Sequence, residues 1–591
     1  MTGKAPHRSG KWSLGALPVL ARSTQVRLFL TLWLVYLVHW SPFVVRELYL
    51  AMSLAERGTV RVDPYVDLHP DLFTIEGRGS FLGNNPGASF LAAVPYWLAL
   101  PVINRVAPVK PSLPEEHLAL GEGYDEERIN RLRFFRRARE MGILMRLAVG
   151  ALVTSGFFMA PLTALGAVCM MRLLWRMGFA RGAALWMAFL FGLGTPVFLR
   201  AGTLSLNLLV GLFTLCAFAL LWRPDDESEL PLADSRAASK KAAELNEEQT
   251  QQFRAMPPPG GAPLRLDDEP TLRGRVVSFE DDETAEIRAV PLPPDHEWLR
   301  YLGAGFLAGW AVLTDYTGAV MAAMLGLFVL WEQFRRKRFA AAVGGTLWFG
   351  LGAVGPVALL LYYQWYCFGD PWLPAQFHMP KKVFAGYPSE RGFGWPLPEA
   401  LWGLLFHPQY GLLIFAPVFA LALYHPVLVL KKQNRVPGRV ALFVWLLFAA
   451  LYVFCSMIHY TIRHQWQDGV RYLVPALPLL LLLVADVLCR MRRWLVLLIT
   501  ALAVAESWAL AMVRESPLAS LQRVLEEGLQ FPWLTTLGKT GGSFFPALTD
   551  PPSALARWIP IGVVAAILIG LALIWSIGPR ERLKEETRGG D

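Results

Sequence analysis

Several acidic residues gather directly after the first long apolar segment of this sequence. Glu47 follows that segment at once, and Asp63 is one of the further acids within residues 46–88. A carboxylate held at the end of a helix is well placed to act on a substrate that arrives along a neighbouring surface. The alternative for Glu47 is a solvated charge at a helix end, with no chemical role.

Cations and aromatic residues share a second stretch, residues 367–409. Lys381, Lys382 and Arg391 lie here among many aromatic residues and prolines. Cations bind phosphate by charge-assisted hydrogen bonds, and aromatic faces hold sugar rings or prenyl chains. An interfacial belt of aromatic residues with scattered cations has the same composition. The residue types alone leave both interpretations open.

A third stretch, His459–Tyr472, carries charges of both signs immediately before an apolar segment. It contains Arg463, His464, Asp468, Arg471 and Tyr472. Two arginines and two histidines in this position suit an anionic lipid headgroup. A simple turn is the alternative, although a turn needs far less charge.

The composition of the chain indicates the surroundings in which these residues operate. Of the 591 residues, 54% are hydrophobic and only 17% are charged, with 22 Trp and 35 Phe. A mean hydropathy of +0.37 is more than soluble cores can bury. The sequence therefore predicts a polytopic membrane protein and excludes a soluble enzyme. It also excludes nucleic acid as a partner, because basic residues beside membrane spans explain the net charge of +9.

The apolar residues fall into segments of the length that helices need to cross or enter a bilayer. These segments are residues 27–45, 89–106, 142–171, 184–199, 203–222, 299–315, 317–333, 341–366, 410–430, 439–458, 472–488, 494–513 and 557–577. They predict an all-α bundle of about 12–13 transmembrane helices. An odd number of crossings cannot leave both termini on one side. Either 89–106 is therefore re-entrant or lies along the membrane, or 142–171 is two short crossings.

Basic residues predict the orientation of the spans. Lys4, Arg8 and Lys11 precede the first apolar segment, and no acidic residue occurs before Glu47. Because basic clusters stay on the cytoplasmic side, we expect a cytoplasmic N-terminus in the inner (plasma) membrane. The segments then expected on the outer face are residues 46–88, 367–409, 459–471 and 514–556.

The same patterns predict how the chain is organised. We expect a cytoplasmic tail (1–26), an N-terminal transmembrane module (27–222), an insert (223–297), a C-terminal transmembrane module (298–513), an outer loop (514–556), and a last helix with a cytoplasmic tail (557–591). The insert holds 18 acidic and 9 basic residues with ten prolines, too few apolar groups to bury a core. It is therefore predicted to be a disordered acidic segment in the cytoplasm.

Local patterns predict roles for three further charged segments. Residues 47–56 fit an amphipathic helix lying at the membrane interface. Asp315 lies at the outer end of an apolar segment. It is either a functional acid within the membrane or an acid at a helix end. Asp486 precedes Arg490 by four residues, which predicts an ion pair on one helix face.

Short motifs in a fixed order resemble the GT-C superfamily of polytopic glycosyltransferases, in the branch similar to protein O-mannosyltransferases and aminoarabinose transferases. Glu47 matches an acid that follows the first span in such proteins. The other matches are Asn85-Pro86-Gly87-Ala88-Ser89-Phe90-Leu91, Leu313-Thr314-Asp315-Tyr316, Phe368-Gly369-Asp370-Pro371, Tyr410-Gly411-Leu412-Leu413-Ile414-Phe415-Ala416-Pro417 and Gly469-Val470-Arg471-Tyr472-Leu473-Val474-Pro475. The resemblance covers about residues 28–490 and implies a GT-C-like bundle with outer-face amphipathic helices and loops.

The resemblance implies sugar transfer from a polyprenyl-phosphate-linked donor, embedded in membrane lipid, to a glycan, lipid or protein acceptor on the outer, periplasmic face. Glu47 would then be the general base, with Asp63 or Asp468 as a second carboxylate. Contacts to the substrate and its departing phosphate would come from Lys381, Lys382, Arg391, Arg463, His464, Asp468, Arg471 and Tyr472. No cofactor is required by the sequence, which contains no nucleotide-binding motif. The superfamily leaves a divalent metal open, but no ligand cluster in the sequence points to one.

Two departures from the pattern of these relatives fall close to Glu47. Many relatives carry paired acids in the first loop, where this chain has Arg46 before Glu47. Many also carry Asp-Lys before the Pro-Gly, where this chain has Asn84 and Asn85. Both changes remove charge from the expected site, so an altered substrate and lost activity are both left open.

Two other classes of protein remain as alternatives. A polytopic transporter would typically show internal repeats and broken helices near the middle of the bilayer. This sequence shows no repeat between its halves, and its charges gather in the predicted outer loops. A non-catalytic, lipid-binding relative of the GT-C fold is the other alternative, which the absent Asp-Lys pair favours.

Overall fold

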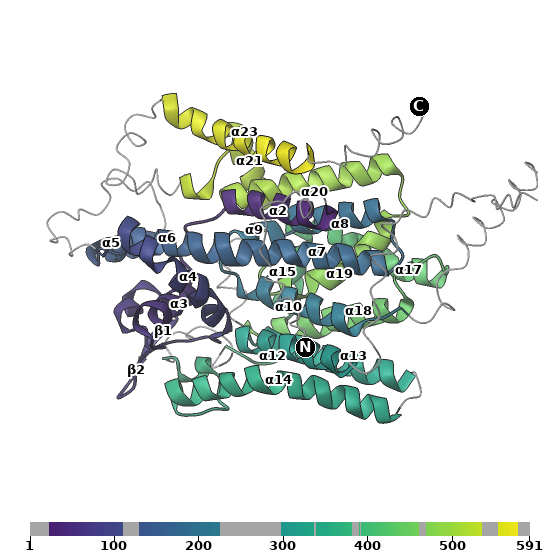
Figure 1. Cartoon of the computed structure of the whole chain (residues 1–591), viewed down its shortest axis with the longest axis horizontal. Helices are drawn as coiled ribbons and strands as arrows, with labels where there is room; N and C mark the ends of the chain where they lie inside the picture. Colours follow the sequence, from purple (N-terminus) through teal and green to yellow (C-terminus); the bar gives the residue numbers. More distant parts are fainter. Residues whose placement is uncertain are drawn as a thin grey trace, which may run out of the picture. The chain divides into compact units, whose positions relative to one another are not determined.

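The computed structural model describes residues 23–109, 129–224, 297–335, 339–380, 389, 392–459, 469–534 and 554–576. Regular structure in these residues is almost entirely helical, which confirms the predicted all-α class (Figure 1). The exception within the described ranges is a β-hairpin. Its strands β1 (Leu72–Ile75) and β2 (Gly79–Leu82) are antiparallel, and Phe73 lies opposite Phe81.

The chain divides into two compact units. The first comprises Met1–Trp222 and Arg300–Asp591, and the second comprises Arg223–Leu299. Only residues 223–224 and 297–299 of the second unit are described. Most of the predicted acidic insert, and the predicted tails, therefore lie outside the described residues.

The helices follow the predicted apolar segments closely. Before the insert they are α2 (Thr24–Val38), α3 (Arg46–Arg57), the 3-10 helix η2 (Asp63–Leu68), α4 (Gly87–Val106), α5 (Ile129–Glu140), α6 (Leu144–Thr154), the π-helical turn η4 (Ser155–Met159), α7 (Ala160–Arg176), α8 (Arg181–Leu193), α9 (Val197–Ala201) and α10 (Leu206–Leu221). After it they are α12 (Glu297–Thr314), α13 (Thr317–Arg335), α14 (Phe339–Phe368), η6 (Ala375–His378), α15 (Pro398–Phe406), α16 (Leu412–Phe415), η8 (Pro417–Tyr424), α17 (His425–Leu430), α18 (Gly438–Ser456), η10 (Val474–Ala476), α19 (Leu477–Leu488), α20 (Arg493–Val513), α21 (Pro517–Glu527) and α23 (Ala554–Ser576).

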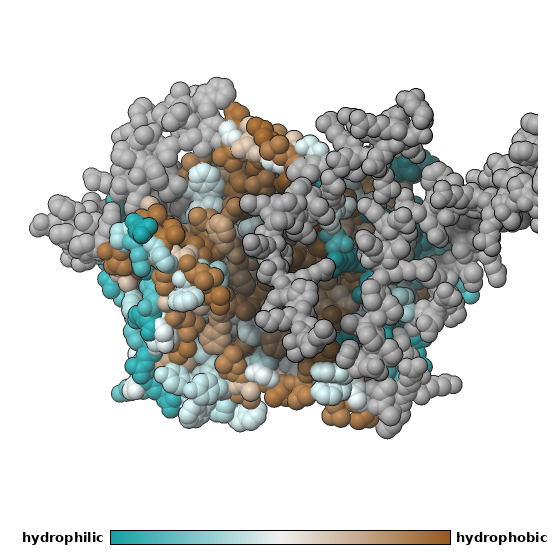
Figure 2. All heavy atoms as spheres, in the orientation of Figure 1, coloured by the Kyte–Doolittle hydropathy of each residue, from teal (hydrophilic) through white to brown (hydrophobic). Residues whose placement is uncertain are grey.

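Six of the described helical segments are long and apolar enough to cross a membrane. They are Gly87–Val106, Leu144–Arg176, Thr317–Arg335, Val343–Phe368, Gly438–Ser456 and Arg493–Val513, accompanied by shorter apolar helices. On the face shown in Figure 2, hydrophobic residues cover much of the described surface, and hydrophilic residues gather where α3, β1 and β2 lie. A bilayer solvates such an apolar exterior. The multi-pass membrane class is confirmed, whereas a total of 12–13 crossings stays a prediction.

Two details of the predicted spans are corrected. The first apolar segment does not continue as a helix to residue 45, because α2 ends at Val38. Ser41 precedes Pro42, and a residue before proline is disfavoured in the α conformation. Residues 142–171 are not two short crossings either. One continuous helical segment, Leu144–Arg176, passes through a π-helical turn at Ser155–Met159.

Helix α3 was expected to expose one face at the membrane interface, yet the protein buries most of its first two turns. Every residue from Glu47 to Ser53 is buried. At its start, the Glu47 carbonyl accepts a hydrogen bond from Ser89 Oγ of α4 (2.8 Å). At its end, Glu56 Oε1 accepts from Tyr96 OH (2.6 Å) and from Arg146 Nε of α6 (2.7 Å). These contacts hold both ends of α3 against the transmembrane helices.

The Asn-Asn-Pro-Gly sequence before α4 joins that helix to the end of α12. The Asn85 amide donates to the Val312 carbonyl (2.7 Å), and the side chains of Asn84 and Asn85 are buried. A Cβ at Gly87 would lie 2.8 Å from the carbonyl atoms of Leu313. The backbones of α4 and α12 therefore approach as closely as only glycine allows.

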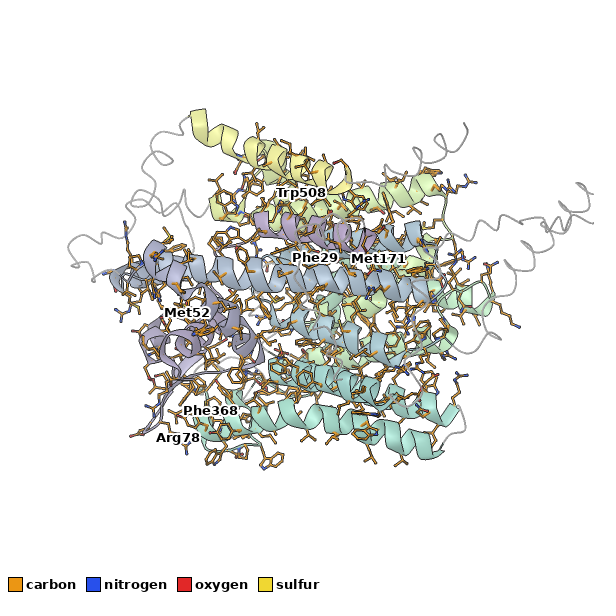
Figure 3. All side chains as sticks on the ribbon, in the orientation of Figure 1. Phe29, Met52, Arg78, Met171, Phe368 and Trp508 are labelled. Atoms are coloured by element: carbon orange, nitrogen blue, oxygen red, sulfur yellow. The ribbon has the colours of Figure 1, made fainter. Side chains whose placement is uncertain are left out.

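The β-hairpin is attached to the end of α14. Phe73 stacks on Phe368, with ring centroids 5.8 Å apart. At the hairpin turn, Arg78 Nη1 donates to the carbonyls of Trp365 (3.2 Å) and Tyr366 (3.1 Å). Figure 3 shows Arg78 and Phe368 close together at this junction. The loop between α3 and α4 is thereby tied to a helix from the second half of the chain.

The predicted partner of Asp486 is wrong. The carboxylate of Asp486 accepts a hydrogen bond from His425 Nε2 (3.1 Å) and from the backbone amides of Arg435 (2.8 Å) and Val436 (3.0 Å). Arg490 instead donates to the Gln433 carbonyl. Asp486 is fully buried. Its carboxylate faces His425 and the loop after α17, and not Arg490 on its own helix.

Asp315 has the role of a helix-end acid. Its Oδ1 accepts hydrogen bonds from the backbone N–H (2.9 Å) and the hydroxyl (2.7 Å) of Thr317, the first residue of α13. This contact satisfies groups that the helix start leaves without intrahelical partners.

We expect Gly87→Ala to lower the thermal unfolding temperature of the protein in detergent. The added methyl group would clash with backbone atoms of α12, and such overpacking costs about 1–3 kcal/mol. The matched control is Gly350→Ala in α14, where a Cβ meets nothing within 4 Å. Equal unfolding temperatures for the two variants would contradict the close approach of α4 and α12.

Candidate functional site

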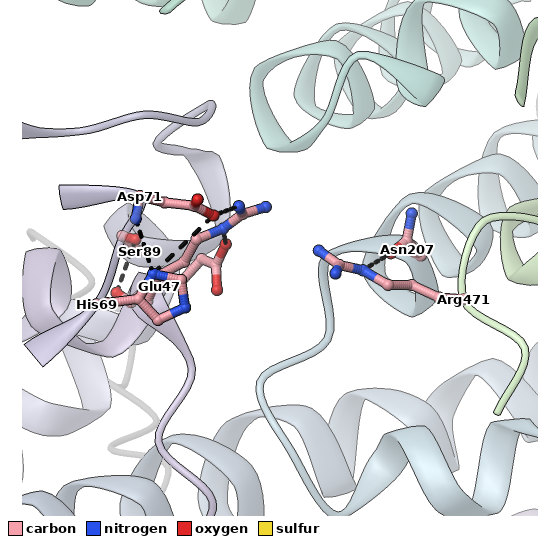
Figure 4. A network of polar contacts seen from close by, with 7 residues as sticks. Glu47, His69, Asp71, Ser89, Asn207 and Arg471 are labelled. Atoms are coloured by element: carbon pink, nitrogen blue, oxygen red, sulfur yellow. Dashed lines mark hydrogen bonds and ion pairs between the residues drawn. The ribbon is translucent and has the colours of Figure 1, made fainter. Parts of the chain in front are cut away.

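Arg46, the first residue of α3, joins two carboxylates at the start of that helix (Figure 4). Its Nε donates to Glu47 Oε1 (2.7 Å), and its Nη1 donates to Asp71 Oδ2. Glu47 is only 3% exposed. Two negative charges and one positive charge therefore lie close together. The group of three side chains has a net charge of −1.

Asp71 reaches Arg46 because the chain turns immediately before β1. The Asp71 N–H donates to His69 Nδ1 (3.1 Å), and the Asp71 carbonyl accepts from the Gly83 amide (2.8 Å). Glu47 is held from the other side by its carbonyl bond to Ser89. Both acids are thus positioned through their backbones, and their carboxylates are left to face Arg46.

Burial and charge act in opposite directions on this group. Burial raises the pKa of Asp71, but the neighbouring Arg46 charge outweighs it and lowers that pKa to about 2. Burial lowers the pKa of Arg46, while Asp71 and Glu47 raise it well above its usual value. Burial also lowers the pKa of His69. A neutral His69 then accepts the Asp71 N–H at Nδ1, so it is no ion-pair partner of the Asp71 carboxylate.

Arg471 approaches the same place from a distant part of the chain. Gly469, with a positive φ of 98°, turns the backbone just before it. The buried Arg200 side chain then holds the turn by donating to the carbonyls of Gly469 (2.9 Å) and Val470 (3.1 Å). Arg471 Nε donates to Asn207 Oδ1 in the first turn of α10 over a long 3.4 Å. Among the described residues, Asn207 is the acceptor of a hydrogen bond from this guanidinium.

Arg471 and the Arg46–Glu47–Asp71 group face one another. Figure 4 shows the Arg471 side chain extending from its loop toward that group. The positive charge of Arg471 also contributes to the lowered pKa values of Asp71 and His69. The amide nitrogen of the neighbouring Asn207 is buried without a hydrogen-bond partner among the described residues. Cationic and amide donors therefore lie opposite a pair of carboxylates.

The predicted site residues fall into three groups. Glu47, Arg471 and Tyr472 belong to this site, with the buried Tyr472 ring 5.4 Å below the Arg471 guanidinium. Asp63 lies in the same loop, but its Oδ1 accepts the Ser80 amide (2.7 Å) and so secures β2. The remaining candidates, Lys381, Lys382, Arg391, Arg463, His464 and Asp468, lie outside the described residues.

Sequence reasoning missed three members of the site. Arg46 was interpreted as a lost charge, and Asp71 was one acid among several in its loop. Asn207 lies in an apolar helix, where a single amide attracts little attention. The one available signal was Asn207 itself, because a polar side chain in the first turn of an apolar segment is costly to bury without a function.

The described residues do not fit a divalent metal ion. No three His, Cys, Asp or Glu side chains among them come together in a group that could hold one. Glu47 and Asp71 both bind the Arg46 guanidinium, so their carboxylates are paired with a cation of the protein.

Comparison with known proteins finds a distant likeness to two solved structures. No protein-family model matches the chain, and no curated protein matches it in sequence. It resembles the crystal structure of ArnT from Cupriavidus metallidurans bound to undecaprenyl phosphate, with 16% identity over 96% of this chain and 77% of ArnT and a TM-score of 0.42. It also resembles the apo oligosaccharyltransferase of Archaeoglobus fulgidus, with 13% identity over 93% of this chain and 60% of that one and a TM-score of 0.34. Likeness at these identities and scores assigns no reaction to this chain.

We expect Asp71→Asn to destabilise the protein at pH 7 by about 2 kcal/mol, the free energy that corresponds to a pKa near 2 rather than 3.8. Since the folded state lowers this pKa, the stabilisation is complete above about pH 4 and is lost as the pH falls toward 2. Unfolding temperatures in detergent at pH 7 and pH 3 test this. Asp67→Asn, in the same loop with an exposed side chain, is the control and should change little at either pH. A destabilisation of Asp71→Asn that is independent of pH would contradict the ion pair.

Proposed function

We propose that this chain is a glycosyltransferase that moves a sugar from a polyprenyl-phosphate-linked donor to an acceptor on the outer, periplasmic face of the inner membrane. The observation that carries the proposal is that Arg471 extends toward the Arg46–Glu47–Asp71 group from a distant part of the sequence. A proton acceptor opposite an anion-binding cation is what transfer from a phosphodiester requires. The order of the GT-C-like motifs supports the same reaction.

In the proposed reaction the acceptor hydroxyl or amine attacks the anomeric carbon of the donor sugar. A bond forms between that carbon and the acceptor atom, while the bond from the carbon to the phosphate oxygen breaks. The acceptor proton passes to a carboxylate, and the polyprenyl phosphate leaves with the electron pair of the broken bond. No nucleotide is consumed, because cleavage of the donor supplies the free energy.

The two carboxylates differ in what they can contribute. Asp71, with a pKa of about 2, is a poor proton acceptor near neutral pH. We therefore keep the general base at Glu47 and give Asp71 the task of orienting Arg46. Glu47 also lies in the first turn of α3, where the helix dipole favours a negative charge.

Arg471 is proposed to bind the phosphate that leaves. Its guanidinium offers donors in the planar arrangement that suits phosphate oxygens. The Asn207 amide nitrogen, buried and without a partner among the described residues, can add a further donor beside it. Lys381, Lys382, Arg391, Arg463 and His464 remain candidates for the same phosphate, Asp468 for a second carboxylate, and Asp63 for a structural role in the hairpin.

A lipid-binding protein without transferase activity is the second candidate. The hydrogen bond from Arg46 to Glu47 favours it, because that bond occupies a carboxylate oxygen that would otherwise be open to an acceptor substrate. Such a protein would still bind a lipid phosphate through Arg471. The two candidates therefore differ in whether Glu47 is needed for turnover.

We expect cells that lack this protein to accumulate one polyprenyl-phosphate-linked sugar, which only an active enzyme removes. Wild type and Glu76→Gln, an exposed acid at the hairpin turn, should restore the normal lipid profile, whereas Glu47→Gln should lower turnover by about 10²-fold or more. Mass spectrometry of extracted glycolipids, with protein levels matched, measures this. Full clearance by Glu47→Gln would remove Glu47 as the base, and an unchanged lipid profile on deletion would favour the lipid-binding candidate.

We expect polyprenyl phosphate to raise the unfolding temperature of the purified wild-type protein, and the phosphate-free polyprenol to raise it less. Arg471→Met should abolish the difference between the two lipids, because the charge-assisted bonds to phosphate are lost. Arg471→Lys should keep part of it. The matched control is Arg492→Met, an exposed arginine before α20. An undiminished response to phosphate in Arg471→Met would place the lipid phosphate elsewhere.

A further inference from the structure

The side chain of Arg46 occupies an unusual position for a cation. It lies in the first turn of α3, where the positive end of the helix dipole disfavours positive charge. Its side chain is 18% exposed, and its two carboxylate partners, Glu47 and Asp71, are 4% and 23% exposed. A cation in this place is stable only because both carboxylates compensate it.

The geometry makes Arg46 a bridge between two carboxylates. Glu47 Oε1 binds Nε, and Asp71 Oδ2 binds Nη1 of the same guanidinium. The two oxygens therefore converge on one small planar cation. Two carboxylate oxygens that converge in this way are also the beginning of a site for Mg²⁺ or Mn²⁺, since these ions bind oxygen ligands.

We propose that Arg46 is a built-in counter-cation, which holds Glu47 and Asp71 in place as a divalent metal ion would and keeps such an ion out. A guanidinium stays charged at any physiological pH and cannot be removed by a chelator. The positions of the two carboxylates therefore do not depend on whether a metal ion is available. Because a guanidinium carries one charge and a divalent ion two, the group retains one negative charge, which faces Arg471.

This inference concerns the same residues as the proposed function but does not rest on sugar transfer. Its test is metal binding, which is measured without turnover. Arg46 acts here as a positioning residue, because it contacts the carboxylates and is given no contact with substrate.

The experiment compares Mn²⁺ binding to the purified full-length protein after treatment with EDTA. Electron paramagnetic resonance measures free Mn²⁺ for wild type, Arg46→Met, Arg46→Lys and the double variant Arg46→Met/Asp71→Asn. Arg46→Met should bind one Mn²⁺ more tightly than wild type, by about tenfold or more, and the double variant should lose this site. Arg46→Lys, which keeps a cation between the acids, should behave as wild type does.

A second measurement keeps the inference testable if Arg46→Met folds poorly. Wild type and Asp71→Asn should bind Mn²⁺ equally weakly, and EDTA should leave the wild-type unfolding temperature unchanged. Added Mn²⁺ should raise the unfolding temperature of Arg46→Met, because a ligand that binds only the folded state stabilises it. A wild-type Mn²⁺ site that Asp71→Asn abolishes would overturn the inference, as would an Arg46→Met protein that is folded without Mn²⁺ yet gains no Mn²⁺ site.

Discussion

The site depends on how a charged helix is buried beside the transmembrane helices. Residues Glu47 to Ser53 of α3 are all buried, although the helix begins with Arg and Glu and ends with Glu and Arg. Buried charges are costly unless each is paired and hydrogen-bonded. Here the Arg46 charge is compensated by two carboxylates at one end, and Glu56 pairs with Arg146 at the other. These pairs set the direction of α3, and with it the position of Glu47.

The same demand for pairing draws distant segments together. Arg200 is buried, and its donors end on the carbonyls of Gly469 and Val470. That contact fixes the turn from which Arg471 extends. In the hairpin between α3 and α4, Arg78 acts in a similar way on the carbonyls at the end of α14. Arginines that bind backbone carbonyls thus join the two halves of the first unit around the site.

Membrane proteins gain little from burying apolar groups against one another, because lipid is as apolar as a leucine side chain. Close backbone contacts at small residues and polar contacts then carry more of the specificity. Gly87 against the end of α12 is one such contact, and Gly211, where a Cβ would lie 3.2 Å from Pro475, is another. Gly87 is the first residue of α4, and Gly211 lies in α10 about one turn after Asn207. Close backbone contacts therefore lie in the same helices, α4 and α10, that carry Ser89 and Asn207.

The sequence by itself determined the class of the protein, the apolar helices and several residues of the site. Hydrophobic segments specify helices because a bilayer leaves no other partner for the backbone polar groups. Glu47 and Arg471 stood out as candidates because each directly adjoins an apolar segment.

Only the tertiary structure decided which charges meet. Arg46 looked like a missing acid until Asp71, brought close by the turn before β1, was seen on its other side. Asp486 looked like a partner of Arg490, but it faces His425 from another helix. The partner of a buried charge is set by the packing of segments far apart in the chain, and no local spacing in the sequence records that packing.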